Sequence, residues 1–280
     1  MTQRSGRIGV CSWSLQANGP AVLVERVRAT GLDAVQLHLD PLRPDFPDSW
    51  GERETIAALA EGGVAVLSGM MTTEGEDYSS LETIRETGGI RPDGTWEANV
   101  AAAQQNAAIA ERIGLTLVTL HAGFIPHNSA DPERTKIVSR LRELIGIFND
   151  RGVDVALETG QETAETLLSV LEEVPEAGVN FDPANMILYG MGDPHEALEK
   201  LGGRVSQLHV KDAVPAEVAG EWGSEVVVGA GFVDWGRFFE IVAERCSGVD
   251  ILIEREAGES RVEDVRAAAE VVRARVGVRA

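Results

Sequence analysis

The sequence predicts an α/β protein built as a single parallel (β/α)8 barrel, and three observations support this. Eight short apolar runs are each followed by a stretch that reads as a helix or a Gly-rich connection leading to one. The length of 280 residues suits one barrel domain. No linker or low-complexity tract divides the chain, so we expect residues 1–280 to form one domain. A doubly wound open sheet is the main competing fold. The eight predicted strands are residues 7–15, 34–40, 64–71, 116–124, 153–158, 178–182, 205–210 and 250–254.

In the first half, turn and cap residues separate the strands from the helices. Pro20 opens an amphipathic helix that Gly31 closes, and residues 34–40 then alternate between apolar and polar side chains. A helix is expected over about residues 52–61, before Gly62 and Gly63. An alanine-rich helix follows over residues 95–113.

The connection formed by residues 72–94 is long for a compact domain and is rich in Gly, Glu, Ser and Thr. Connections of this length are usually functional or carry a short helix of their own. A lid over the active site is one hypothesis for this segment.

The second half repeats the alternation of strand and helix. Asp131 and Pro132 supply an N-cap and a first-turn proline for the helix before the fifth strand. A Gly-rich stretch that ends at Gly231 separates the seventh strand from a helix beginning at Asp234. The remaining helices are expected over residues 163–173, 194–201 and 259–276.

Composition limits the classes of partner. Lys and Arg number 25 against 45 for Asp and Glu, and the formal net charge of −20 disfavours nucleic acid and anionic lipid surfaces as partners. No apolar run reaches membrane-spanning length. Cys11 and Cys246 are too few for a disulfide framework or a thiolate zinc site. We therefore expect a cytoplasmic protein with a small-molecule substrate, whose oligomeric state, including a homo-oligomer, the sequence leaves open.

Four metal-ligand residues lie at the C-terminal ends of the last four predicted strands, namely Glu158, Asp182, His209 and Glu254. Side chains at these strand ends converge above the core of a parallel barrel. Taken singly, each residue could equally be a turn residue, a helix cap or a hydrogen-bonded rim histidine. Together they predict an oxygen-rich site with one imidazole, which suits Mn²⁺, with Mg²⁺, Co²⁺ or Zn²⁺ as alternatives.

The two-residue period of a strand predicts which neighbours share the site. Lys211 should lie on the same face as His209, and Glu256 on the same face as Glu254. Lys211 could polarise a substrate oxygen or pair with Glu256. Arg255 should point the other way.

Other residues near strand ends are candidate substrate contacts. His121 follows the fourth strand and could bind a substrate hydroxyl or pack at the rim. His38 and Trp13 end the second and first predicted strands and could form a wall of the site, although core packing is the alternative for Trp13. The two glycines Gly229 and Gly231 could admit a phosphate near the seventh and eighth strands.

Several sequence runs resemble those of the xylose-isomerase-like sugar phosphate isomerase/epimerase superfamily, which includes D-tagatose 3-epimerase and inosose dehydratase. These runs are Ala-Leu-Glu-Thr-Gly, Asn-Phe-Asp-Pro-Ala-Asn, Leu-His-Val-Lys-Asp-Ala, Gly-Ala-Gly-Phe-Val-Asp-Trp, Ile-Glu-Arg-Glu-Ala-Gly and the His-Ala-Gly at residues 121–123. The resemblance covers nearly the whole chain. It implies that Glu158, Asp182, His209 and Glu254 hold one divalent ion, usually Mn²⁺, and that Glu158 and Glu254 form the acid/base pair.

The chain departs from the ketose epimerases of that superfamily at two positions. They carry a second histidine three residues after the Asp ligand, where this chain has Asn185. They also carry an arginine shortly after the His ligand, whereas residues 213–217 contain none. Both family residues grip the sugar, so Asn185 takes a substrate-contact position and a plain ketohexose epimerase is disfavoured. Endonuclease IV, a DNA-cleaving relative with a richer histidine set, fits poorly with five histidines and a charge of −20.

This site predicts an isomerase or epimerase of a sugar or sugar phosphate. The metal stabilises the enediolate that forms when a proton leaves the carbon next to a carbonyl, and the two glutamates remove and return protons. Loss of a β-hydroxyl or a glycosidic group at the same site would instead make a dehydratase or lyase. A non-catalytic sugar-binding barrel is a third class, which the pair Glu158 and Glu254 disfavours.

Overall fold

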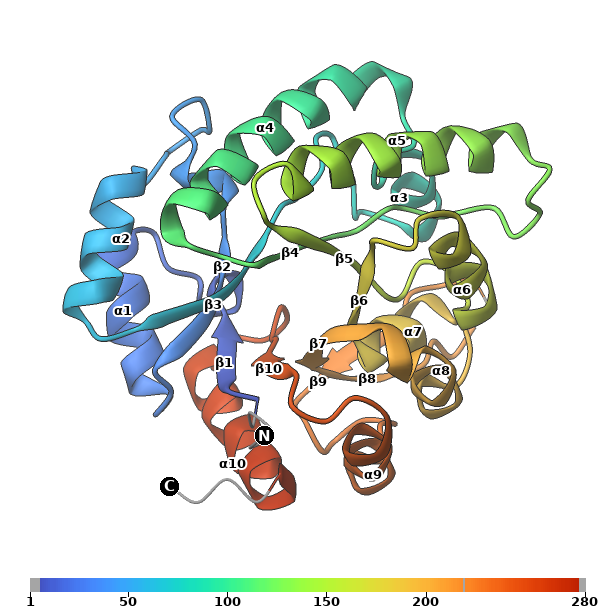
Figure 1. The fold of residues 1–280 in the computed structure, drawn as a ribbon. Helices are drawn as coiled ribbons and strands as arrows, with labels where there is room; N and C mark the ends of the chain where they lie inside the picture. The colour runs from blue at the N-terminus through green and yellow to red at the C-terminus, as the bar shows by residue number, and fades with distance from the viewer. Residues whose placement is uncertain (1–5, 219, 277–280) are drawn as a thin grey trace.

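Eight parallel strands close into a barrel in the order β1-β10-β7-β6-β5-β4-β3-β2 (Figure 1). The computed structural model describes residues 6–218 and 220–276. The barrel strands are β1 (Ile8–Cys11), β2 (Ala34–His38), β3 (Ala65–Met70), β4 (Leu117–Leu120), β5 (Asp154–Glu158), β6 (Gly178–Phe181), β7 (Val205–Val210) and β10 (Asp250–Ile253). The predicted (β/α)8 barrel is therefore confirmed and the open sheet is excluded, while the extent of the domain over residues 1–280 stays a prediction.

The helices form an outer layer around the strands, and both ends of the described chain lie beside α10 (Figure 1). The α-helices are α1 (Pro20–Ala29), α2 (Glu52–Glu61), α3 (Leu81–Thr87), α4 (Trp96–Ile113), α5 (Pro132–Asn149), α6 (Ala164–Glu173), α7 (Pro183–Tyr189), α8 (Pro194–Leu201), α9 (Trp235–Arg245) and α10 (Arg261–Val276). Short 3-10 turns are η1 (Ser12–Leu15), η2 (Asp40–Leu42), η3 (Asp93–Thr95) and η4 (Gly202–Arg204). Within the described residues, every helix is too short or too polar to cross a membrane.

Local sequence explains where most helices begin. The side chains of Asp131, Thr163, Asp193 and Asp234 each accept a hydrogen bond from a backbone N–H in the first turn of the helix that follows. Such caps satisfy donors that have no partner within the helix. The predicted helix starts at Asp131 and Asp234 are confirmed.

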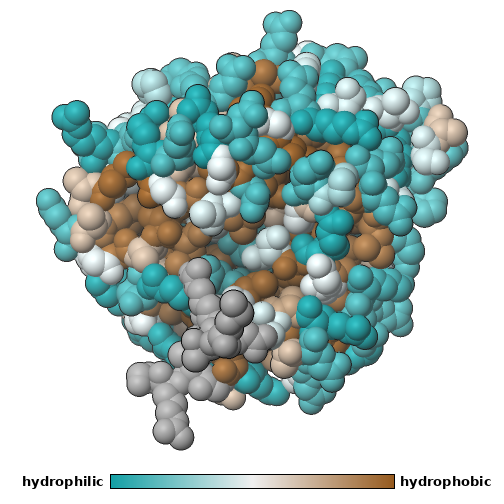
Figure 2. All heavy atoms as spheres, viewed as in Figure 1, coloured by the Kyte–Doolittle hydropathy of each residue, from teal (hydrophilic) through white to brown (hydrophobic). Residues whose placement is uncertain are grey.

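The hydrophobic core lies between the strands and the inward faces of the helices. Large apolar side chains such as Phe148 on α5, Phe181 on β6 and Phe238 on α9 are fully buried there. On the face drawn in Figure 2, hydrophilic residues cover most of the rim and hydrophobic residues show nearer the centre. The polar surface agrees with the acidic composition.

Two predicted strands are shorter than expected. The first strand ends at Cys11 and continues as η1, so Trp13 lies in a 3-10 turn rather than at a strand end. The fourth ends at Leu120 instead of residue 124. There Gly123 adopts a φ of 89°, and a Cβ on it would lie 2.5 Å from the carbonyl oxygen of Gly88. Only glycine permits this φ and this close approach of the two backbones.

The sequence analysis missed helix α7, which follows β6 directly. Asp182 accepts hydrogen bonds from the backbone N–H groups of Ala184 and Asn185, and Pro183 occupies the first turn. Gly190 ends the helix with a φ of 68°. These are ordinary start and stop signals, but the helix has only 7 residues and was hidden between a strand and the next helix.

The two long connections contain regular structure. Residues 72–94 carry the short helix α3, which is one of the two expectations for this segment. The Gly-rich stretch after β7 contains an antiparallel pair, β8 (Asp212–Val214) and β9 (Ser224–Val226), which was not predicted. The suggested phosphate site is wrong, because the N–H groups of Gly229 and Gly231 both donate to the carboxylate of Asp212.

Candidate metal centre and active site

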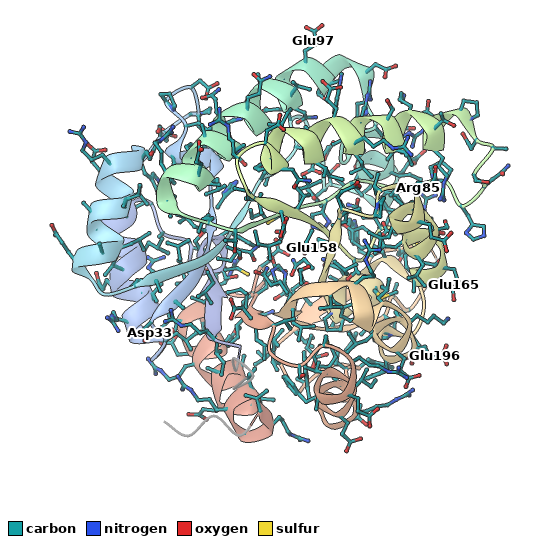
Figure 3. The ribbon with its side chains drawn as sticks, viewed as in Figure 1. Asp33, Arg85, Glu97, Glu158, Glu165 and Glu196 are labelled. Carbon is teal, nitrogen blue, oxygen red and sulfur yellow. The ribbon has the colours of Figure 1, made fainter. Side chains whose placement is uncertain are left out.

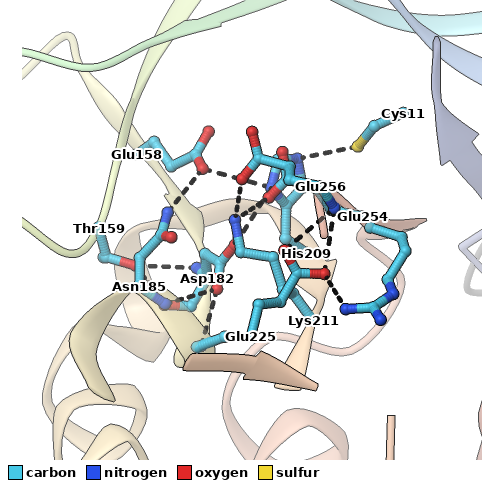
Figure 4. Close-up of polar contacts among 12 residues, drawn as sticks. Cys11, Glu158, Thr159, Asp182, Asn185, His209, Lys211, Glu225, Glu254 and Glu256 are labelled. Carbon is cyan, nitrogen blue, oxygen red and sulfur yellow. Dashed lines mark hydrogen bonds and ion pairs between the residues drawn. The ribbon is translucent and has the colours of Figure 1, made fainter. Parts of the chain in front are cut away.

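The four predicted ligands meet at one end of the barrel. Glu158 ends β5, Asp182 follows β6, His209 lies near the end of β7 and Glu254 follows β10. One donor atom from each residue lies within 4.8 Å of the others. Figure 3 shows Glu158 inside the ring of elements, while Glu97, Glu165 and Glu196 lie at its outer edge. Four buried side chains from strands far apart in sequence thus form one cluster (Figure 4).

The donor atoms surround Nδ1 of His209. The nearest carboxylate oxygens lie 3.4 Å away on Glu158, 3.6 Å away on Asp182 and 3.3 Å away on Glu254. Asp182 uses Oδ1 to cap α7, which leaves Oδ2 toward the cluster. Asp182 Oδ2 and His209 Nδ1 are buried and lack a hydrogen-bond partner among the described residues. Unsatisfied buried acceptors of this kind, next to two further carboxylates, fit a divalent cation.

The far side of His209 is held by a buried amide. Oε1 of Gln36 lies 2.7 Å from Nε2 of His209. The amide nitrogen of Gln36 donates to Oγ1 of Thr119 at 2.8 Å and to the carbonyl oxygen of Gly69 at 3.3 Å, so its oxygen must face the imidazole. Donation from Nε2 to this oxygen would leave Nδ1 to present its lone pair to the cluster, which is the arrangement that metal ligation requires.

Cys11 also lies close to the cluster, with Sγ 3.6 Å from Nε2 of His209. It forms an alternative ligand group with His209 and Glu254. Burial raises the pKa of the Cys11 thiol to about 12, which keeps it protonated near neutral pH. A thiol in this state is a weak ligand, and the three-carboxylate group is the better metal site.

Two asparagines and one histidine hold Glu158. Asn180 donates to Oε2 at 3.0 Å and Asn185 donates to Oε1 at 3.0 Å. Nε2 of His121 lies 3.5 Å from the same Oε1. Asn185 and His121, both predicted as substrate contacts, therefore touch Glu158 and also line the adjoining cavity.

Glu254 has a different set of partners. The indole N–H of Trp13 donates to Oε1 at 2.6 Å, and Nζ of Lys211 donates to Oε2 at 2.6 Å. Lys211 also donates to Glu256 at 2.7 Å, so the predicted pairing of these two residues is present. Arg255 points away from the cluster and pairs with Glu225, as the strand period predicted.

The charges of the cluster stabilise one another. Burial alone would raise the pKa values of Glu158, Asp182 and Glu254, but the histidine and lysine side chains around them outweigh this and lower all three. The largest opposing influence is His121 for Glu158, and Lys211 for both Asp182 and Glu254. The three acids are therefore ionised at neutral pH, which is the state that binds metal.

A cavity of about 600 Å³ opens beside the cluster. Glu158 and Glu254 form part of its wall, together with Trp13, His38 and Asn185. The predicted substrate contacts Trp13, His38, His121, Asn185 and Glu256 all line it, whereas Lys211 reaches it only through Glu254 and Glu256.

His38 has its own orienting partner. Its Nε2 lies 2.9 Å from Oδ2 of Asp40, and Asp40 also accepts hydrogen bonds from Asn106 and Thr72. The sequence analysis named His38 but missed Asp40. Gln36 was also missed, although it lies two residues before His38 and therefore on the same strand face.

Comparisons with known proteins agree with the barrel fold. A family model described as xylose isomerase-like TIM barrel matches residues 24–275. The crystal structure of a xylose isomerase domain protein from Planctomyces limnophilus is 31% identical, with a TM-score of 0.87 over 98% of this chain and 100% of that one.

More distant similarities involve named enzymes. The 3-oxo-isoapionate decarboxylase of Pectobacterium atrosepticum is 25% identical over 129 residues, which are 44% of this chain and only 46% of that relative. The 3-keto-D-glucoside 4-epimerase of E. coli is 15% identical and has a TM-score of 0.70 over 96% of this chain and 99% of that one. At that identity the second likeness shows the fold alone.

Proposed function

Because the chain belongs to the xylose isomerase-like TIM barrel family, we propose that it is a divalent-metal-dependent isomerase or epimerase of a small carbohydrate. The observation that carries this proposal is the pair of ionised glutamates, Glu158 and Glu254, which share one ligand cluster and one cavity. The barrel strands that hold them are separated by β6 and β7, so the two carboxylates reach the cavity from different sides.

We propose that Glu158, Asp182, His209 and Glu254 hold one divalent ion, with Mn²⁺ as the first candidate. Three carboxylates and one imidazole form a hard donor set that suits Mn²⁺, and Mg²⁺, Co²⁺ and Zn²⁺ are the alternatives. When bound, the ion would act as a Lewis acid for negative charge that develops on substrate oxygens.

The two glutamates would move the protons. One carboxylate removes the proton next to the substrate carbonyl. The other takes up a proton from solvent in the cavity and delivers it to the opposite face of the same carbon or to the neighbouring carbon, and the first then releases its proton to solvent. Asn185 and His121 orient Glu158, while Trp13 and Lys211 orient Glu254. Both glutamates therefore have fixed side-chain positions before substrate arrives, which general acid/base catalysis requires.

A dehydratase or lyase reaction at the same site is the second candidate. Hydrogen bonds connect Glu254 through Lys211 to Glu256, whose side chain is 53% exposed. This chain of groups provides a route by which a proton could reach a leaving oxygen from solvent. The similarity to a decarboxylase over part of the chain also favours keeping this candidate.

Proton NMR in D₂O tests the proposal directly. The Mn²⁺-loaded protein would be incubated with free ketoses, phosphorylated ketoses, keto-glycosides and inososes. Because Mn²⁺ is paramagnetic and broadens NMR lines, the same reactions would be repeated with protein in which Mg²⁺ replaces Mn²⁺. We expect deuterium to appear at the carbon next to the carbonyl with at least one candidate, and to be lost in Glu158→Gln. An epimerised product would identify the first candidate and a product that has lost a β-substituent the second.

A binding protein without catalytic activity would give a different result. If metal binds at one ion per chain and a ligand binds in the cavity, but no proton exchanges in wild type or in Glu158→Gln, the protein is a sugar-binding barrel and the proposal is wrong. The substitution of Glu by Gln keeps the shape of the side chain, so loss of exchange cannot be attributed to loss of packing.

A further inference from the structure

The cavity beside the ligand cluster has an aromatic wall that the acid/base chemistry does not use. This wall consists of Tyr189 on α7 and Trp222 in the segment before β9, and both line the cavity. Resting on the proposed function, we infer that the substrate is an uncharged keto-glycoside whose attached group, a second sugar or an aromatic aglycone, stacks on Tyr189 and Trp222.

The wall stands at a defined distance from the site of proton transfer. Asn185, which donates to Glu158, and Tyr189 are four residues apart on α7, so they lie on one face of the helix and about 6 Å apart along its axis. The contact to Glu158 and the aromatic residue therefore lie about one helical turn apart along α7. This spacing places the ring beside the next group along the substrate, beyond the reacting carbon.

The two rings are fixed in position. Their centroids lie 4.9 Å apart, and Phe124 packs edge-on against the other side of Tyr189 at 5.6 Å. The N–H of Gly223 donates to the carbonyl oxygen of Leu188, which ties the segment carrying Trp222 to α7. The planes of the two rings are tilted by 57°, so each ring presents its own apolar face to the cavity. A face held in this way suits the C–H face of a sugar or an aromatic group at little entropic cost.

The charge of the cavity disfavours an anionic substrate. Five glutamates line it and, among its described lining residues, none is Lys or Arg. These glutamates are Glu76, Glu158, Glu225, Glu254 and Glu256. Asp182 adds a sixth carboxylate, against which a divalent ion, Lys211 and Arg255 together supply four positive charges. A phosphate or carboxylate on the substrate would meet a net negative field in a partly desolvated site.

The size of the cavity agrees with a substrate larger than one sugar ring. Its volume of about 600 Å³ falls within the range of pockets that enclose drug-sized ligands. A free ketose bound at the cluster would leave the aromatic wall unfilled. A group attached to the ketose would fill the part of the cavity beside Tyr189 and Trp222.

The test compares matched ligands and matched variants. The ligands are methyl and phenyl keto-glucosides, a keto-disaccharide, and a free and a 6-phosphorylated ketose. Binding is measured by quenching of tryptophan fluorescence, and kcat/KM by proton exchange in D₂O. Trp222→Ala removes one ring, Trp222→Phe retains an aromatic ring, and Phe232→Ala serves as control because Phe232 is 65% exposed and lies outside the cavity lining.

We expect the phenyl keto-glucoside or the keto-disaccharide to bind about tenfold more tightly than the methyl compound, in line with stacking on aromatic side chains. Trp222→Ala should reduce that ratio to about one, while Trp222→Phe and Phe232→Ala should largely preserve it. The 6-phosphorylated ketose should bind more weakly than the free ketose.

Equal affinity for methyl and extended glycosides in the wild-type protein, an unchanged ratio in Trp222→Ala, or a preference for the phosphorylated ketose would each overturn the inference. Failure of the proposed function gives a different result, namely no proton exchange with any ligand. In that case the ratio of dissociation constants still decides whether the aromatic wall binds the attached group.

Discussion

The two halves of the barrel contribute different chemistry to one site. Strands β5, β6, β7 and β10 supply all four members of the charged ligand cluster. Strands β2, β3 and β4 supply neutral polar side chains below it, namely Gln36, Ser68 and Thr119, all buried. A closed barrel brings both sets to the same axis although they are far apart in sequence.

The comparison shows how charge and orientation are divided. Gln36, held by Thr119, contacts Nε2 of His209 from another part of the barrel. Ser68 donates to Gln207 at 2.5 Å, Gln207 donates to Asn180 at 3.1 Å, and Asn180 donates to Glu158. The first half therefore positions the groups that the second half supplies. Three changes, taken from the largest expected effect on turnover to the smallest, would break or sharpen this division.

Glu254→Gln removes a charge from the second half while keeping the shape of the side chain. We expect proton exchange to fall by about 10²- to 10⁴-fold, the usual contribution of a positioned acid/base group. Metal affinity should fall only moderately, because three ligands remain. The measurement is the exchange rate by NMR at saturating metal. Glu240→Gln, a change at an exposed position on α9, is the matched control, and full activity in Glu254→Gln would remove this residue from the mechanism.

Gln36→Leu removes an orienting group from the first half. Loss of a hydrogen-bond partner behind a metal-bound histidine typically weakens metal binding about 10- to 100-fold, and we expect a loss of this size. Metal titration by calorimetry measures it without reference to activity. Gln105→Leu on the exposed face of α4 controls for loss of a glutamine. Unaltered metal affinity in a folded Gln36→Leu protein would show that the first half does not position His209.

Glu162→Gln provides a contrast with the ligand cluster, because Glu162 is a buried glutamate whose charge no neighbouring side chain among the described residues compensates. Glu162 is buried four residues after Glu158, and burial without compensation raises its pKa to about 8 from an ordinary value of 4.5. A raised pKa means that the folded state binds more protons than the unfolded state between these values. The contribution of Glu162 to stability should therefore be greatest below about pH 4.5 and decline as pH rises toward 8.

The slope of that decline is at most about 1.4 kcal/mol per pH unit for one group. In Glu162→Gln this contribution should disappear, and turnover should not change. The midpoint of urea unfolding at several pH values measures it, with Glu240→Gln again as control. The same pH dependence in both variants and wild type would show that Glu162 is compensated in solution.

The sequence predicted the fold and the ligand cluster because both depend on repeated local signals. An apolar run followed by a ligand at each of four strand ends is visible without any tertiary information, and the barrel brings such ends together. Parity along each strand also gave the pairing of Lys211 with Glu256 and the outward direction of Arg255.

The features that were missed depend on contacts between distant segments. The contact between Gln36 and His209 can be interpreted only when it is known that the amide nitrogen of Gln36 donates to Thr119. Trp222 and Tyr189 are 33 positions apart by their numbers and meet only because the segment before β9 folds back onto α7. The fourth strand was predicted too long because the close approach of Gly88 and Gly123 has no local signature.

Asp212 has a consequence for how this barrel can change. Its carboxylate lies at the start of β8 and accepts hydrogen bonds from Gly229, Gly231, Val233 and the indole of Trp235. One side chain thus fastens both ends of the excursion that carries Trp222, directly next to Lys211. We expect that the loop between β8 and β9 can be exchanged for the corresponding loop of a related protein without a change in metal affinity. Substrate range could then diversify by recombination of a single loop, with the reacting groups left untouched.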